Sequence, residues 1–391
     1  MLPYIVLFMI PVFAVLSPWK ADVILKKFIW IFFAFGLILF IGFRNEIGGD
    51  WLAYVDGYPD FRTASVDEAF NLNSDDLGYS ATRLFFGRLD HYWNDGRSLS
   101  IIGYDGYARL IGRDIFFTNL FCAAIFSIGL LRFCNVLPFP WLGLVVSVPY
   151  LIIVVAMGYT RQAVSIGFIM WGMVDLLKYR YFKFLIAIFF AILFHKPALI
   201  LMAFTIFINK SKKDFRRKIF AMAVISPAMI LIFLVRFDHF YNNYYASPTN
   251  AGLSYGGGFR IAILLVSVVL FLFFRKSWKK IFPDSNLWLA FCGFSFILIF
   301  LFSSFPVATD RVALYLYPFQ LIVFGRLPML IRDNLNRTLF VFGVILFHAT
   351  ILFTWLIFAV HSEWWLPYQN YLTTDFEERI FIKRNFRAPS F

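Results

Sequence analysis

Apolar residues form runs along the whole chain, and short polar or charged stretches separate these runs. A membrane-spanning helix needs about 20 predominantly apolar residues, and many of the runs approach that length. We therefore expect an all-α polytopic membrane protein, a single integral domain over residues 1–391, with about twelve transmembrane or re-entrant helices. The expected helices cover residues 2–17, 28–43, 115–131, 139–157, 163–177, 184–194, 197–208, 219–235, 259–274, 286–303, 312–324 and 338–360.

Lysine and arginine concentrate in every second connection between these runs. Six short segments carry 20 of the 36 basic residues. Because positively charged loops remain in the cytoplasm, these six segments are expected to face it together. The long segment 44–114 and the tail 361–391 then face the periplasm. The six segments are 18–27, 132–138, 178–183, 209–218, 275–280 and 325–337.

The composition changes how the positive charge is interpreted. Hydrophobic residues make up 61% of the chain and charged residues only 15%, well below the roughly 25% of soluble proteins. A net charge of +13 could indicate nucleic-acid binding, but the basic residues flank membrane spans, so we expect no nucleic-acid partner.

Arginine and lysine divide between the two sides of the predicted membrane. Twelve of the 14 lysines fall on the cytoplasmic side, whereas 14 of the 22 arginines fall outside. The arginine fork suits two-point contact with phosphate or carboxylate. The split therefore predicts an outward-facing anion site, unless these arginines pair with outer acids or reach lipid headgroups.

The 44–114 segment is too long for a simple turn and is expected to contain short helices and functional residues. It carries 12 acids against seven arginines and no lysine. It opens with Arg44, Gly48-Gly49, Asp50 and Tyr54, and paired glycines permit close backbone approach. Alternatively, the glycines end a helix and Asp50 caps the next one. Further along, Leu84 to Trp93 has the spacing of an amphipathic helix, lying on the outer leaflet or against the bundle.

Arg161 and Gln162 stand at the start of an apolar helix that begins outside the membrane. Free backbone N–H groups and the helix dipole favour an anion there, and an arginine adds a full charge. The pair is a candidate phosphate clamp. The alternative is that Arg161 extends to lipid headgroups.

His195 and Lys196 lie at the tip of a short hairpin, residues 184–208. Its arms hold about 11 and 12 residues, or roughly 17 Å each, against a hydrocarbon core of about 30 Å. We therefore expect the tip inside the membrane, lining a wet cavity that opens outward. His195 would act there as an acid–base group or phosphate donor. Alternatively, both arms are ordinary short spans and His195 lies at the interface.

Three further outer segments add candidates. Asp310 and Arg311 precede a span that contains Tyr315, Arg260 opens another span, and Tyr368 lies in the tail. Tyrosines at such depths commonly form the interfacial belt, which competes with a substrate-binding role.

Motifs for nucleotide binding, zinc proteolysis and serine hydrolysis are absent from the sequence, and the outer acids lack metal-ligand spacing. We therefore expect no cofactor and no metal.

Four segments together resemble the bacterial polysaccharide polymerases of the EpsG type, which include many Wzy O-antigen polymerases. They are FRNEIGGDWLAY (43–54), GYTRQAVSIG (158–167), LFHKPALI (193–200) and TDRVALY (309–315). Lys196-Pro197 departs from the pattern, which usually has small polar residues there. The resemblance implies a C-type membrane glycosyltransferase of the bacterial inner membrane, with its active site facing the periplasm. Donor and acceptor would be undecaprenyl-diphosphate-linked oligosaccharides, and a chain-length regulator would be a further partner.

In such a reaction the leaving diphosphate needs fixed cations and the attacking hydroxyl needs a base. Arg161, Arg311 and Arg44, joined by Arg260 and Lys196, are expected at the diphosphate. Asp50 is the expected base with His195 at the diphosphate, although these two roles could be exchanged. The residues expected to contact the rest of the substrate are Tyr54, Gln162, Asp310, Tyr315 and Tyr368.

Other functions remain open on the sequence. An O-antigen ligase shares the diphosphate chemistry and differs in its acceptor, and a membrane acyltransferase is a further alternative. A lipid-linked oligosaccharide flippase or other transporter predicts internal repeats and ionisable residues deep in several spans. No clear repeat is present, and most charges lie at span ends.

Overall fold

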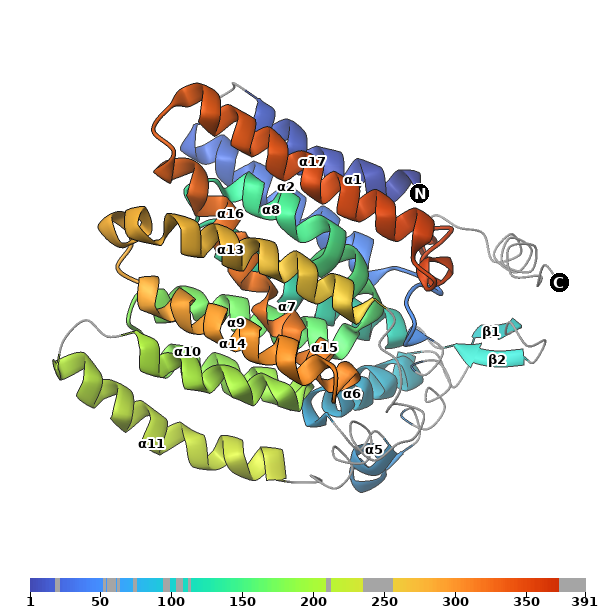
Figure 1. The fold of residues 1–391 in the computed structure, drawn as a ribbon. Helices are drawn as coiled ribbons and strands as arrows, with labels where there is room; N and C mark the ends of the chain where they lie inside the picture. Colours follow the sequence, from blue (N-terminus) through green and yellow to red (C-terminus); the bar gives the residue numbers. More distant parts are fainter. Residues whose placement is uncertain are drawn as a thin grey trace.

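The computed structural model describes residues 1–17, 22–51, 54, 61, 64–72, 76–93, 99–102, 108–111, 114–208, 212–234 and 256–372. Helices dominate this part of the chain (Figure 1). In chain order the elements are α1 (Leu2–Leu16), α2 (Val23–Gly42), α5 (Val66–Leu72), α6 (Leu77–Trp93), β1 (Leu99–Ile102), β2 (Ala108–Ile111), α7 (Asp114–Cys134), α8 (Pro140–Ser147), η1 (Val148–Ala156), α9 (Thr160–Leu177), α10 (Tyr181–Phe194), η2 (Lys196–Phe207), α11 (Lys212–Leu234), α13 (Gly257–Ile281), α14 (Ser285–Phe302), α15 (Pro306–Ala313), η4 (Leu314–Leu316), α16 (Tyr317–Leu330), α17 (Asn334–Phe358) and η5 (Ser362–Trp364).

The predicted helical, multi-pass architecture is confirmed. Each predicted apolar run falls on helical residues, but two runs are divided: 139–157 into α8 and the π-helix η1, and 312–324 among α15, η4 and α16. Helix α15 begins at Pro306, before the predicted start of that run. Within the described residues, seven helices are long and apolar enough to cross a membrane, and shorter apolar helices include Leu2–Leu16, Pro140–Ala156, Tyr181–Phe194 and Lys196–Phe207. The number of crossings, twelve or fewer, therefore stays a prediction.

The helices run along a common direction, so the molecule has two ends (Figure 1). The N-terminus, α5, α6 and the β1–β2 hairpin gather at one end, on the right of the view, which we call the loop end. The α13–α14 and α16–α17 connections lie at the opposite end, the basic end. This separation agrees with the alternation of basic connections, whereas the side of the membrane that each end faces stays a prediction.

Large apolar side chains cover the outside of the bundle. Phe32, Phe273 and Phe300 are each about 80% exposed. A soluble protein rarely leaves contiguous apolar surface uncovered, but lipid covers such a surface at no cost. The exposed phenylalanines thus fit a protein embedded in a bilayer.

Tight packing of α9 against α7 and α10 forms the centre of the fold. A Cβ atom on Gly129 of α7 would collide with the carbonyl of Gly167 in α9, and one on Gly172 would lie 2.7 Å from the Cβ of Ala187 in α10. Small residues let membrane helices approach closely. Helix α9 is therefore held rigidly from both sides.

The described helices and strands between residues 43 and 114 lie at the loop end (Figure 1). The predicted amphipathic helix is α6, and it packs against the bundle, with Gly78 against Phe194 at the end of α10. The hairpin of β1 and β2 was not predicted. Helix α2 ends at Gly42, so Gly48-Gly49 do not terminate it; Gly48 has a φ of 103° and approaches the Met157 carbonyl too closely for any side chain.

The residues that follow α17 return across the loop end and tie it together. Trp365 is buried, and its Nε1 donates to the Ile153 carbonyl of η1 at 2.7 Å. The Tyr4 hydroxyl of α1 donates to the Trp365 carbonyl at 2.7 Å. A π-helix widens the turn and frees carbonyl groups, so Trp365 supplies a donor that η1 needs.

Candidate functional site

Side chains from five separate stretches of the chain meet where α9 begins, at the loop end. We call them the α9 cluster: Asp50, Tyr54, Asp76, Arg161, Gln162, Ser165, His195, Arg311 and Tyr315. Seven of these nine residues were predicted as site residues; Asp76 and Ser165 were not. The geometry therefore gathers most of the predicted site.

Arg161 contacts the acidic residues of the cluster. One of its guanidinium nitrogens lies 3.0 Å from Asp76 Oδ2, and its side chain keeps 29% of its surface exposed while that of Asp76 keeps 5%. Arg161 also lies close enough to Asp50 and Tyr54 for both side chains to interact electrostatically with its guanidinium. The pairing with Asp76 realises one predicted alternative, an outer arginine bound to an outer acid, but it leaves part of the guanidinium accessible.

Tyr54 links this pair to Asp50. The Tyr54 hydroxyl lies 3.4 Å from Asp50 Oδ2, at the long limit of a hydrogen bond. Burial, followed by the nearby Asp50 charge, raises the pKa of Tyr54 well above its ordinary value. Tyr54 is thus a neutral phenol that can donate a proton in a hydrogen bond but does not ionise.

His195 is held by a short chain of hydroxyl groups. Its Nδ1 lies 2.6 Å from the Tyr315 hydroxyl, which donates to Ser165 Oγ at 3.2 Å. A phenol has one hydrogen, so when it is given to Ser165, Nδ1 of His195 must carry the hydrogen of the first bond. In that arrangement Nε2 holds the ring's lone pair. These hydrogen positions are deduced from the bonding pattern of the three side chains.

Arg311 and Gln162 complete the cluster. The Arg311 guanidinium carbon lies 4.1 Å from the centre of the Tyr159 ring, and the Arg311 carbonyl accepts from Gln162 Nε2 at 2.6 Å. Gln162 Oε1 is buried and has no partner among the described residues. An unmet buried acceptor costs about 1–3 kcal/mol, which favours a water or ligand donor beside it. Arg311 and Arg161 are both close enough to His195 for their charges to act on it.

Arg260 and Asp310 form a separate ion pair beside the cluster. Arg260 Nε lies 2.7 Å from Asp310 Oδ1, and both side chains are less than 10% exposed. Asp310 immediately precedes Arg311 in α15, so the two neighbours point to different partners. Asp310 therefore neutralises Arg260, which makes Arg260 a weaker candidate for holding an anion than Arg311.

Arg44 and Tyr368, two predicted site residues, serve packing in this structure. Arg44 is buried and donates to neutral oxygens, those of Ile41, Asn119 and Thr160, the last at 2.6 Å. Tyr368 stacks on Phe40 with ring centres 4.4 Å apart and donates to the Phe40 carbonyl. Burial raises the pKa of Tyr368 to about 12. Their contact with substrate stays a prediction.

Lys196 is buried at the first position of η2, directly after His195. The Ala198 N–H donates to the His195 carbonyl at 3.2 Å, which closes the turn. Helices α10 and η2 thus meet at His195, although α10 begins at Tyr181, before the predicted first arm, and the depth of this turn in the membrane stays a prediction.

Sequence reasoning missed Asp76, Ser165 and the aromatic support from Tyr159. Asp76 was one of many outer acids, and 85 positions separate it from Arg161. Ser165 lies one helical turn after Arg161, so the i, i+4 spacing on α9 was the signal that could have found it. Among the described residues no cluster of His, Cys, Asp and Glu suits a metal ion.

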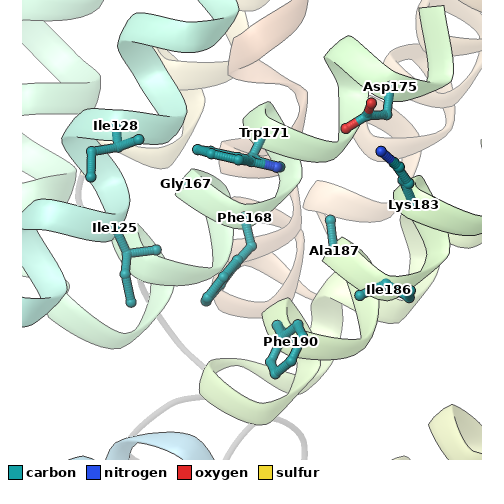
Figure 2. A pocket seen from close by; sticks show the side chains of 10 residues that line it. All are labelled: Ile125, Ile128, Gly167, Phe168, Trp171, Asp175, Lys183, Ile186, Ala187 and Phe190. Carbon is teal, nitrogen blue, oxygen red and sulfur yellow. The ribbon is translucent and has the colours of Figure 1, made fainter. Parts of the chain in front are cut away.

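An apolar groove lies on the outside of α7, α9 and α10, away from the cluster. It encloses about 400 Å³ and is lined by residues such as Ile125, Phe168, Trp171 and Phe190. Figure 2 shows Asp175 and Lys183 facing one another at one end of this groove, with the aromatic rings along the rest. Asp175 also pairs with Arg132 at 2.9 Å and Arg180 at 3.5 Å.

Comparison with known proteins identifies the family of the chain. Residues 104–370 match the model of the EpsG family, which covers more than half of the chain and includes Arg161, His195 and Arg311. No curated protein and no solved structure matches. The match favours a polysaccharide-polymerase-like function. By this match over α7 to the tail, the chain belongs to the EpsG family.

Proposed function

We propose that this protein polymerises undecaprenyl-diphosphate-linked oligosaccharide repeat units at the periplasmic face of the bacterial inner membrane. In each cycle a sugar hydroxyl of an incoming unit attacks the anomeric carbon of the growing chain. A new C–O bond forms, the bond from that carbon to the lipid diphosphate breaks, and the diphosphate leaves as an anion. The hydroxyl proton passes to a base of the protein.

The α9 cluster provides fixed cations for the leaving group. Arg161 and Arg311 come from different helices, and both lie close to His195. A leaving diphosphate gains negative charge in the transition state, and cations already in place stabilise it without reorganising. Loss of one such donor in other enzymes costs about 3–4 kcal/mol. Lys196, next to His195, would add a further positive charge.

Asp50 is our candidate for the base. It is half-buried, lies within reach of Tyr54, and shares the cluster with Arg161. A general base must lie within hydrogen-bond reach of the hydroxyl that it deprotonates. His195 would then donate its Nε2–H to the diphosphate, which requires the other tautomer, with Nδ1 accepting from the Tyr315 hydroxyl. In the reverse assignment Nδ1 carries the hydrogen and the lone pair on Nε2 accepts the proton.

The gathering of Arg161, Arg311 and His195 at one helix start is the observation that carries this proposal. It is tested by expressing Arg161→Ala in a host that lacks its own copy and measuring polymer length by gel electrophoresis. We expect elongation to be lost while the protein still accumulates in the membrane. Arg180→Ala is the matched control, because Arg180 is also paired with an acid but lies at the basic end.

Removing Arg161 leaves Asp76 buried without its partner, which can destabilise the fold. The double variant Asp76→Asn, Arg161→Ala removes both charges and keeps the shape of the acid. If this variant is as stable as the wild type and makes polymer of normal length, the diphosphate role of Arg161 is wrong.

A ligase that joins finished polymer to a lipid core is the second candidate, because it would use the same leaving group. Only the acceptor distinguishes the two. Purified protein supplied with lipid-linked repeat units as the sole substrate should form a ladder if it is a polymerase and no product if it is a ligase.

A further inference from the structure

A second cavity opens at the loop end, between η1, α13, α17 and the returning tail. It encloses about 270 Å³. We call it the aromatic pocket and define it by six of its lining residues: Tyr150, Tyr159, Arg260, Thr354, Trp355 and Trp365. We propose that this pocket binds a sugar ring of the acceptor repeat unit, an inference that rests on the proposed polymerase function.

The lining of the pocket suits a pyranose. One face of such a ring carries mostly C–H groups, and its rim carries hydroxyls, so it needs flat apolar walls with polar atoms between them. Tyrosine and tryptophan offer an apolar ring and a polar tip. Tyr150, Tyr159 and Trp355 supply such walls. The guanidinium of Arg260 and the hydroxyl of Thr354 lie among them and can bond to sugar hydroxyls.

The groove of Figure 2 is the instructive contrast. Its walls are isoleucine, phenylalanine and tryptophan, and its charged residues, Asp175 and Lys183, lie together at one end. Such a groove suits hydrocarbon. The aromatic pocket also has apolar lining, such as Val154, Phe259 and Phe358, but Arg260, Thr354 and His361 line it together with its tyrosines and tryptophans.

Tyr159 connects the pocket to the proposed reaction centre. It lines the pocket and also carries the Arg311 guanidinium on its ring, 4.1 Å from the ring centre. Arg260 also lines the pocket, and it pairs with Asp310, the residue that precedes Arg311. A sugar in the pocket is therefore separated from the Arg311 site by a single aromatic wall, which places the acceptor next to the donor's leaving group.

The walls are fixed before any ligand arrives. Trp365 donates to the Ile153 carbonyl, packs edge-on against Trp355 with ring centres 5.0 Å apart, and lies where a side chain on Gly158 would collide with it. The Tyr150 ring packs 5.0 Å from that of Tyr317, whose hydroxyl donates to the Arg260 carbonyl. A preformed site loses little freedom on binding.

The test fills the pocket without touching the α9 cluster. Thr354→Trp places a large ring inside it, and Thr350→Trp is the matched control, since Thr350 is exposed one turn earlier on the same helix. The probe is the host's own repeat-unit oligosaccharide, released from its lipid by mild acid. Binding to purified protein in nanodiscs is measured by saturation-transfer NMR and calorimetry.

We expect the wild type and Thr350→Trp to bind the oligosaccharide equally, and Thr354→Trp to bind it about tenfold more weakly or worse. Should Thr354→Trp fail to fold, Thr354→Leu, which removes the hydroxyl and adds little volume, should still weaken binding measurably. Equal binding by wild type and by a folded Thr354 variant overturns the proposal, as does a wild type that does not bind.

This readout is independent of catalysis. A wild type that binds the oligosaccharide through Thr354 but makes no polymer from lipid-linked units would contradict the proposed function and leave the sugar pocket standing. A wild type that makes polymer, together with oligosaccharide binding that is unchanged in Thr354→Trp, would contradict the sugar pocket and leave the proposed function standing.

Discussion

A buried carboxylate is paired with arginine at each end of α9, with Arg161 at the loop end and with two arginines at the basic end, yet the two ends differ in what surrounds the charges. At the basic end Asp175 receives Arg132 and Arg180, and Arg132 also lies flat on Trp171, 4.1 Å from a ring centre. At the loop end Arg161 binds Asp76 but shares its surroundings with Tyr54, Asp50 and the hydroxyl-held His195.

Each end keeps a buried polar atom without a partner among the described residues: a donor, Nη1 of Arg132, at the basic end, and an acceptor, Oε1 of Gln162, at the loop end. The difference lies in the groups that surround these atoms. The carboxylate of Asp175 has two arginine partners, and the group links α7, α9 and the turn before α10. At the loop end Gln162 keeps a buried oxygen without a partner among the described residues, and cations arrive from both α9 and α15. A buried ion pair alone is weak support for function or stability. Two cations from different helices beside a histidine, a half-buried acid and an unmet acceptor are stronger support for a ligand.

The two largest effects are expected within the α9 cluster, and Arg311→Ala is one of them. The ring of Tyr159 fixes the Arg311 guanidinium in the cluster. Removing this cation should lower the rate of elongation about 10²–10³-fold, because the negative charge on the leaving diphosphate loses one stabilising partner. The rate is measured with purified protein and lipid-linked units. An elongation rate within twofold of the wild type would remove Arg311 from the reaction.

Replacing the candidate base should have an effect of similar size. Asp50→Asn should slow elongation about 10²–10⁴-fold, as expected for loss of a general base. Asp175→Asn, the same change at the other end of the molecule, should leave the rate per folded molecule unchanged. A pH–rate profile that loses its acidic limb in His195→Gln and keeps it in Asp50→Asn would exchange the roles of the two residues.

A smaller loss is expected from Tyr315→Phe, which keeps the ring and removes the bond to His195. One hydrogen bond contributes about 0.5–1.5 kcal/mol, so the rate should fall roughly tenfold or less. Ser165→Ala should act in the same direction more weakly, since it lies one bond further from the histidine. Tyr315→Phe with an unchanged rate and pH profile would show that His195 needs no such support.

The smallest effect is expected at the basic end. The Arg180 side chain is 53% exposed, so solvent screens its bond to Asp175 and Arg180→Ala should change stability by no more than about 1 kcal/mol. Thermal unfolding in nanodiscs measures this change. A loss of elongation without a loss of stability would mean that the basic end also takes part in the reaction.

The orientation of the two ends can be tested separately. A cysteine at Asp50, the exposed side of the cluster, should react with a small membrane-impermeant reagent added from the periplasm, because the three native cysteines are buried. Lys196→Cys, deeper in the same site, should react more slowly from that side. Reaction only from the cytoplasm would invert the predicted topology.

The sequence predicted the parts of this molecule that follow local rules. Apolar runs located the helices, and the short arms around His195 indicated a hairpin, because length and hydropathy are local properties. The start of α9 identified Arg161, and the expected entry to the span that contains Tyr315 identified Arg311, which the structure places in the last turn of α15. Pairings such as Arg161 with Asp76 join residues far apart in sequence, so no local pattern contains them.

Arg44 and Tyr368 illustrate the remaining difficulty. Both stand in polar stretches at the loop end. The sequence there does not distinguish an arginine or tyrosine that binds substrate from one that makes packing contacts within the protein. The Arg44 side chain turns inward to Ile41, Asn119 and Thr160, and Tyr368 turns onto Phe40. Only packing decides between these uses.

The most direct test of the account is elongation by the purified protein in a defined membrane. Supplied only with undecaprenyl-diphosphate-linked repeat units, the wild type should produce a ladder of lengthening chains and release the lipid diphosphate, one for each bond formed. The variant Arg311→Ala should bind the units and leave them unjoined. Units that remain single with a folded wild-type protein, or a ladder of equal length from Arg311→Ala, would contradict the central claim that the α9 cluster holds a departing diphosphate.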